Sequence, residues 1–277
     1  MTTRTQTRPA TTTGALGEDR AGPASTAAAR LGALARAELT LLVRNRTALF
    51  VAGAMPLLMT GSIRATLDEV GLGRTGLTVA EAAMTGGLGM MLVIVVYVNL
   101  VAAYTARREE LVLKRLRTGE VSDLEVLSGT ALPSAVLAVG QCAIMVVAAV
   151  AFLDVRAPQR PELLVGGLLL GLVMLVALAA VTSGMTRTVE SAQITTLPLF
   201  LVSALGSGLF VPLEVFPERV ASVCELLPLT GVMTLLRAGW LGGGDTAGLT
   251  GAGVTALVWT GLALYAARRW FRWEPRR

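Results

Sequence analysis

Six long stretches without a single charged side chain constrain this chain more than any other feature. They lie at about 47–63, 82–106, 131–153, 163–186, 191–213 and 246–267, and polar segments separate them. An apolar helix of about 20 residues crosses the hydrocarbon core of a bilayer and satisfies its own backbone hydrogen bonds there. We therefore predict an all-α integral membrane protein with six transmembrane helices.

The composition agrees with a membrane protein and excludes several kinds of nucleotide-binding and catalytic site. Hydrophobic residues make up 53% of the chain and charged residues 16%, whereas soluble domains carry about 25% charged residues. The chain has no histidine, and its one lysine, Lys114, follows Leu113. A phosphate-binding P-loop needs a Gly-Lys pair, and histidine is needed for Ser-His or Cys-His dyads and for HExxH zinc sites. We expect no catalytic residues, no metal site and no cofactor bound by this chain.

The placement of positive charge predicts the orientation. With both termini inside, Lys and Arg number seven in the N-terminal tail, five in the loop after the second span, one after the fourth and five in the C-terminal tail, which is 18 of 24. Lys and Arg concentrate on the cytoplasmic side of membrane proteins. We predict cytoplasmic termini, and we attribute the net charge of +5 to this bias rather than to nucleic-acid binding.

The chain before the first span has two parts. Residues 1–29 lack an apolar core, which predicts a disordered cytoplasmic tail rather than a signal peptide, and residues 30–277 form the predicted transmembrane domain. From 30 to 46, leucines and arginines alternate at helical spacing. This pattern favours a helix lying in the inner membrane interface, with an N-terminal extension of the first span as the alternative.

A charged segment between the second and third spans, "ARREELVLKRLRTGEVSDLEVLSG", contains signals for two helices. The second span continues beyond the membrane in good helix formers and meets its first C-capping residue at Gly119. Ser122 and Glu125 then form a capping box for a short helix over 122–128, which Gly129 and Pro133 interrupt before the third span. This elbow presents Leu124, Val126 and Leu127 and is typical of a docking site, although a solvated loop is the plainer alternative.

The segment between Leu213 and Asp245 is too apolar for an ordinary loop, yet its prolines and charges prevent a full span. "ERVASVCELL" and "TGVMTLLRAGW" each predict a short helix. Irregular backbone at membrane depth is tolerated only where protein or water covers it. We predict a re-entrant pair at the outer face, with a folded extracellular cap as the alternative.

The stretch "RREELVLKRLRTGEVS" resembles the ABC-2 type permeases, the membrane subunits of ATP-binding-cassette exporters for drugs and polysaccharides. Leu111 and Val112 stand where that family usually has Gly-Thr, and Glu120 stands where it usually has proline. "RNRTALFVAGAMP" and the segment between the fifth and sixth spans are also similar to the family. The residues that match its pattern are Glu109, Glu110, Leu113, Lys114, Arg115, Leu116 and Ser122.

This resemblance implies a permease subunit in a bacterial plasma membrane that exports a hydrophobic, drug-like or lipid-linked compound. ATP and Mg²⁺ would be bound by a separate ABC-type ATP-binding protein, and a second permease subunit, identical or paralogous, would complete the exporter. The short cytoplasmic helix would couple the two proteins. The coupling role falls on Glu109, Glu110, Leu113, Arg115, Leu116, Ser122, Asp123, Leu124 and Leu127.

Few polar residues lie within the spans. Those that could line a substrate route are Tyr97, Asn99, Gln141, Gln193 and Thr196, and hydrogen bonding between helices is an equally good explanation for each. No charged residue lies within a span, which argues against an ion-coupled carrier. A non-transporting membrane anchor that binds a partner through the elbow is the main alternative to a permease.

Overall fold

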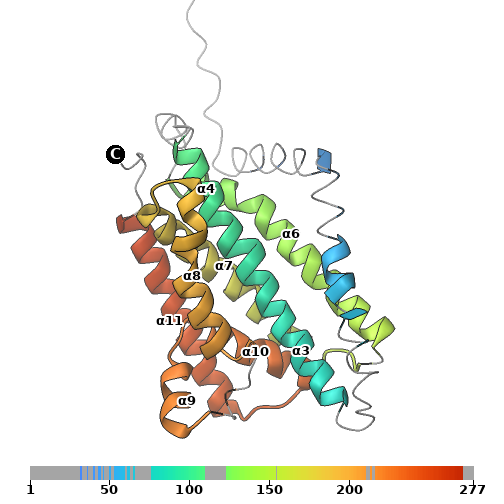
Figure 1. The fold of residues 1–277 in the computed structure, drawn as a ribbon. Helices are drawn as coiled ribbons and strands as arrows, with labels where there is room; N and C mark the ends of the chain where they lie inside the picture. Colours follow the sequence, from blue (N-terminus) through green and yellow to red (C-terminus); the bar gives the residue numbers. More distant parts are fainter. Residues whose placement is uncertain are drawn as a thin grey trace, which may run out of the picture.

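The computed structural model describes residues 76–109, 123–153, 155–209 and 216–270, together with residue 213 and isolated positions between 32 and 65. Within these residues every long element is a helix and there is no strand, so the predicted all-α class is confirmed (Figure 1). The elements are α3 (Gly76–Met91), η1 (Leu92–Val98), α4 (Asn99–Glu109), α6 (Asp123–Phe152), α7 (Pro161–Met185), α8 (Val189–Gly206), α9 (Glu218–Glu225), α10 (Thr230–Leu241) and α11 (Thr246–Trp270).

Five of the described helical stretches are long and apolar enough to cross a membrane, and they match the second to sixth predicted spans. They cover Ala83–Glu109, Val126–Phe152, Pro161–Met185, Val189–Gly206 and Thr246–Trp270. Only part of the predicted first span lies outside the described residues, and 53–59 within it are helical. The predicted tail over 1–29 also lies outside them, as does most of the predicted interfacial helix.

The second predicted span is one helix made of three consecutive segments, α3, η1 and α4. Its middle segment, Leu92–Val98, is a π-helix, and the backbone N–H of Asn99 reaches back to the carbonyl of Ile94. A π segment closes its hydrogen bonds over five residues instead of four and is frequently found at functional sites. Beyond Glu109 the predicted overhang up to Gly119 lies outside the described residues.

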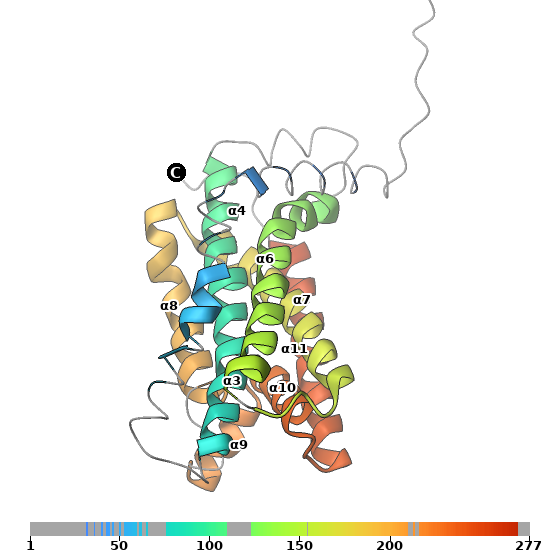
Figure 2. The ribbon, with the colours of Figure 1, turned by 90° about the vertical axis from the view of Figure 1, so that its right-hand side faces the viewer.

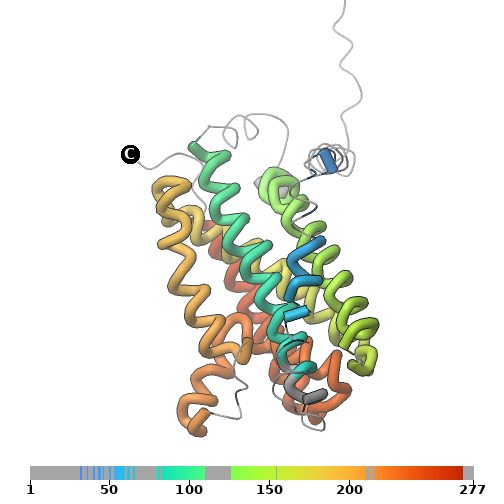
Figure 3. The backbone as a smooth tube through the Cα atoms, turned by 45° about the vertical axis from the view of Figure 1, so that its right-hand side comes forward, coloured from blue at the N-terminus to red at the C-terminus, as the bar shows by residue number. Residues whose placement is uncertain are grey.

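The third span corrects one prediction. We expected a separate helix over 122–128, but α6 runs without a break from Asp123 to Phe152 and carries Pro133 inside it. Proline removes one backbone hydrogen bond and bends a helix, and membrane helices tolerate such a bend. Figures 2 and 3 show the first turns of α6 leaning away from the axis of the rest. Pro133 therefore bends the helix and does not end it.

The fifth span is shorter than predicted. It begins after a capping box made by Thr188 and Ser191, and it ends at Gly206 rather than near 213. Gly208, two residues later, has φ of +77°, a conformation that glycine adopts without steric cost and that turns the chain out of the helix. The glycine-rich stretch thus stops the span early.

Two short helices follow where the sequence predicts them. α9 and α10 are separated by a break of four residues and meet at an angle of 96°. α10 is buried, with Val232, Leu236 and Trp240 at 1% exposure or less. It packs against α7 and α11 within the bundle, near the lower end in Figure 1. A helix that is apolar and covered on most sides is a core element rather than a loop.

Helix α7 lies at the centre of the bundle and contacts every other spanning helix that the structure describes. Small residues allow the close approach of its neighbours. A Cβ on Gly171 would lie 2.8 Å from Val232 of α10, and one on Gly239 of α10 would lie 2.8 Å from the Cα of Leu164 in α7. Such small-residue contacts drive helix association in membranes, where lipid is as apolar as the core.

Candidate functional site

The end of α4 lies where three other helix ends meet. At the upper end of the bundle in Figures 1 and 2, α4 finishes at Glu109, α6 begins at Asp123, α7 finishes at Met185 and α8 begins at Val189. We call this the Arg108 end, and the opposite end, which carries α9, the α9 end. The predicted coupling segment lies between the last residue of α4 and the first of α6 in the sequence. Its residues Glu110, Leu113, Arg115, Leu116 and Ser122 lie outside the described residues, and so do the side chains of Asp123 and Leu124.

Two hydrogen bonds attach α4 to the start of α6. The Tyr104 hydroxyl donates to the backbone carbonyl of Leu127 at 2.8 Å, and Arg107 Nη1 donates to Thr130 Oγ1 at 3.1 Å. Tyr104 is fully buried. Since these bonds hold both sides of the predicted coupling segment, the position of α6 depends directly on that of α4.

The structure corrects the expectation that the start of α6 presents its apolar side chains. Val126 is 2% exposed and Leu127 is 8% exposed. Both side chains therefore pack inside the bundle, because the helix that carries them is the continuous start of a span. A role for Leu127 in coupling stays a prediction, but it would act through packing against the bundle and not through direct contact with a partner.

Arg108 is a buried cation that ties α4 to the end of α7. It is 1% exposed, and Nη1 donates to the backbone carbonyl of Ser183 at 2.6 Å while Nη2 donates to that of Thr186. The last carbonyls of a helix have no partner within the helix and carry its negative dipole end. A guanidinium, with its rigid fork of donors, satisfies two of them at once. The sequence pattern had assigned Arg108 only to the positive-inside bias.

Glu109 makes the complementary contact with α8. Its Oε1 accepts a hydrogen bond from the backbone N–H of Val189, the first residue of that helix, at 3.2 Å, and its side chain is exposed. The first N–H groups of a helix lack partners within it and form its positive dipole end. Of the predicted coupling residues whose side chains the structure describes, Glu109 is thus the one in direct contact with the start of α8.

The predicted pathway residues differ in how far they are exposed. Tyr97, Gln141 and Thr196 are buried, whereas Asn99 and Gln193 are exposed on the outside of the bundle. The Tyr97 hydroxyl lies 3.1 Å from Thr182 Oγ1, and Thr196 Oγ1 donates to the carbonyl of Gln193 at 2.9 Å. Interhelical or local hydrogen bonding therefore explains Tyr97 and Thr196.

Gln141 differs from the other pathway residues. Its side chain is 6% exposed, and its Oε1 has no hydrogen-bond partner among the residues that the structure describes. An unsatisfied buried acceptor costs free energy, about 1–3 kcal/mol in proteins generally. A role in a substrate route stays a prediction for Asn99, Gln141 and Gln193.

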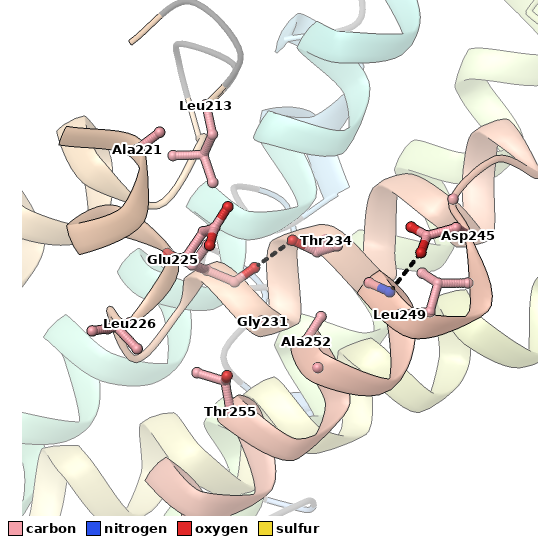
Figure 4. A pocket seen from close by; sticks show the side chains of 14 residues that line it. Leu213, Ala221, Glu225, Leu226, Gly231, Thr234, Asp245, Leu249, Ala252 and Thr255 are labelled. Carbon is pink, nitrogen blue, oxygen red and sulfur yellow. Dashed lines mark hydrogen bonds between the residues drawn. The ribbon is translucent and has the colours of Figure 1, made fainter. Parts of the chain in front are cut away.

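A groove of about 590 Å³ opens at the α9 end, between the α9–α10 turn and the start of α11 (Figure 4). Its walls are mainly leucine, alanine, glycine and threonine, and two acidic side chains, Glu225 and Asp245, also line it. Asp245 accepts a hydrogen bond from the backbone N–H of Gly248 at 3.1 Å, so one carboxylate already stabilises the first turn of α11. The groove lies at the opposite end of the bundle from the site at Arg108.

A model of the family described as "ABC-2 type transporter" matches residues 29–241 of this chain. The matched region includes the end of α4, the segment 110–122 and the α9–α10 pair. No curated protein matches the sequence.

Proposed function

We propose that this chain, which belongs to the ABC-2 type transporter family, is the permease subunit of an ATP-binding-cassette exporter. It is a multi-pass membrane protein with a membrane transport domain. In the proposed exporter a separate ABC-type ATP-binding protein binds ATP and Mg²⁺, and a second permease subunit, identical or paralogous, completes the complex. The family match carries this proposal.

The contacts at the Arg108 end support a coupling role for the adjoining segment. Both flanks of 110–122 are fixed to the bundle by hydrogen bonds from Tyr104, Arg107, Arg108 and Glu109 to three other helices. A displacement of this segment therefore reaches α6, α7 and α8 without passing through a flexible linker. An ordinary solvated loop would not need anchors on three helices.

The distribution of charge supports the proposed orientation. The Arg108 end carries Arg107, Arg108 and Arg187, and it also carries Arg268 and Arg269 in the last turn of α11. Cationic side chains of this kind mark the cytoplasmic side. In the proposed orientation the Arg108 end faces the cytoplasm and the α9 end faces outward, in the plasma membrane of a bacterium.

The cargo in this proposal is a hydrophobic or amphipathic compound, drug-like or lipid-linked, that moves out of the cell. No acidic or basic residue lies within the central parts of the five described spans, so the bundle offers no charged relay of the kind that proton- or sodium-coupled carriers use. ATP hydrolysis in the partner is then the source of energy.

Copurification tests the proposal. The chain is expressed with a candidate ABC-type ATP-binding protein from the same organism and recovered from detergent extracts, as the native sequence and as Leu124→Asp. We expect the native chain to retain the partner and Leu124→Asp to lose it while still inserting into the membrane. Ala157→Asp is the matched control, because it places the same charge at an exposed position of the α9 end.

Equal recovery of the partner with Leu124→Asp and Ala157→Asp would overturn the coupling assignment. Absence of the partner from the native chain would overturn the proposal as a whole. Stimulation of ATP hydrolysis by candidate amphipathic compounds in the reconstituted complex separates a permease from a membrane anchor, because an anchor has no substrate.

A further inference from the structure

The α7–α8 turn and the coupling segment are joined by two neighbouring residues of opposite charge. We propose that Arg108 and Glu109 form a clamp that makes this turn follow the coupling segment, with Arg108 as its permanent half and Glu109 as its releasable half. The inference rests on the proposed function. It identifies the α7–α8 turn as the element that moves with the coupling segment. It also identifies Arg108, which is not among the predicted coupling residues, as a positioning residue.

Electrostatic complementarity is the first argument. Thr186, Arg187 and Thr188 are the only residues between the end of α7 and the start of α8, so the negative end of one helix dipole lies beside the positive end of the next. The cation of the clamp contacts the α7 carbonyls and its anion contacts the first N–H of α8. The reversed order of charges would repel both helix ends.

Geometry explains how two adjacent residues reach two different helices. Successive side chains on an α-helix point about 100° apart, since one turn holds 3.6 residues. Arg108 therefore points into the bundle, where it is 1% exposed, while Glu109 points outward along the surface toward Val189. The backbone of α4 fixes both directions, so any rotation or translation of its last turn moves both contacts together.

The two halves differ in how easily they release. Arg108 donates to two backbone carbonyls in a site closed to water, where water cannot replace a lost hydrogen bond and breaking one leaves a buried acceptor unsatisfied, which is costly. Glu109 makes one described bond of 3.2 Å, and its carboxylate is exposed, so water replaces that partner at little cost. The end of α7 is thus held to α4 by buried bonds, and the first N–H of α8 is held by a bond that water can replace.

The structure of α8 agrees with a separable start. Its own capping box satisfies its first turn, because Thr188 Oγ1 accepts from the backbone N–H of Ser191 at 3.3 Å and Ser191 Oγ accepts from that of Thr188 at 3.0 Å. The helix therefore keeps its N-terminus intact when Glu109 leaves. The short turn then acts as a pivot between a held helix and a released one.

Hydrogen–deuterium exchange of the full-length chain in nanodiscs, in complex with its ATPase, tests the clamp. Exchange at the backbone amides of 186–190 is compared without nucleotide and with ATP and vanadate. We expect the native complex to change its exchange rate at Val189 by about tenfold, the size of one lost or gained hydrogen bond of about 1.4 kcal/mol, and Arg108→Gln to abolish this nucleotide response. A role of Arg108 in folding alone would alter exchange equally in both states.

Three further variants sharpen the result. Arg187→Gln is the matched control, because Arg187 is an exposed arginine of the same turn, and we expect it to respond to nucleotide as the native chain does. Arg108→Lys keeps the charge but cannot bridge both carbonyls with a planar fork, and we expect a partial response. Glu109→Ala should exchange rapidly at Val189 in both states, and it also tests the clamp if Arg108→Gln fails to fold.

Two outcomes would overturn the clamp while leaving the proposed function in place. One is a full nucleotide response in an Arg108→Gln complex that retains its ATPase, and the other is loss of the response in Arg187→Gln. A native chain that recovers no ATPase would overturn the proposed function and the clamp with it. A native complex that hydrolyses ATP without any change at 186–190 would overturn the clamp alone.

Discussion

Gly239 of α10 provides the most direct test of how the buried short helix packs. A Cβ built on this residue would lie 2.8 Å from the Cα of Leu164 and 2.9 Å from its Cβ. These atoms belong to the backbone region of α7, so no flexible side chain can move aside. Gly239→Ala therefore forces α10 and α7 apart, because carbon atoms pack favourably only at about 3.5–4.0 Å.

The expected magnitude follows from two opposing effects. Alanine is favoured over glycine in a helix interior by about 0.8–1 kcal/mol, whereas overpacking a well-packed site costs about 1–3 kcal/mol. Gly166→Ala is the matched control, since Gly166 lies in α7 with nothing within 4 Å of its Cβ position. Both variants gain the same helix propensity, so the difference between their stabilities reports the steric collision of the new methyl group with α7. We expect Gly239→Ala to be about 1–3 kcal/mol less stable than Gly166→Ala.

Unfolding in mixed micelles measures this difference. Helix content is followed by circular dichroism as the mole fraction of sodium dodecyl sulphate rises, and the midpoints of the native chain and both variants are compared. We expect the midpoint of Gly166→Ala at or above that of the native chain and the midpoint of Gly239→Ala below it. Coincident midpoints for the two variants would show that α10 does not press against α7 at this residue, which would refute the described packing.

Three further substitutions test individual contacts. Tyr97→Phe removes the hydroxyl that lies 3.1 Å from Thr182 Oγ1, and we expect the free energy of unfolding to fall by about 0.6 kcal/mol. A double-mutant cycle with Thr182→Val separates this hydrogen bond from other effects of the substitution. Trp259→Phe removes the hydrogen bond from Nε1 to the carbonyl of Leu226, 2.8 Å long, and should cost about 1 kcal/mol and increase proteolysis at the α9–α10 turn. Gly208→Ala places a side chain at φ of +77°, which should cost about 1–2 kcal/mol in the same unfolding assay. Unchanged stability in any one of them would contradict the corresponding contact.

The predicted spans and the structure agree where hydrophobic length alone decides the outcome. A run of about 20 residues without charge has few alternatives to a spanning helix, and five predicted spans coincide with described helices. The pair α9 and α10 also follows from local signals, because Pro217 and Pro228 limit the two helices.

The sequence fails where tertiary contacts override local signals. Gly129 and Pro133 predict an interruption, yet α6 continues through them, and membrane helices tolerate an internal proline in this way. The two backbone carbonyls to which Arg108 donates lie 75 and 78 residues further along the chain. Backbone acceptors leave no pattern in a sequence, so no spacing of side chains could identify them.

The two ends of the bundle are held together by different forces, and this difference has a mechanical consequence. Towards the α9 end, α7, α10 and α11 meet through glycines whose contacts leave no space for a methyl group. Close packing of this kind resists sliding, because any displacement creates a collision or a void. At the Arg108 end, hydrogen bonds between α4 and its neighbours hold α6, α7 and α8, and the exposed one, between Glu109 and Val189, can be exchanged with water. The bundle is therefore built to stay rigid at the α9 end and to change at the end where the coupling segment attaches, so a displacement applied there opens the start of α8 before it disturbs α7, α10 or α11.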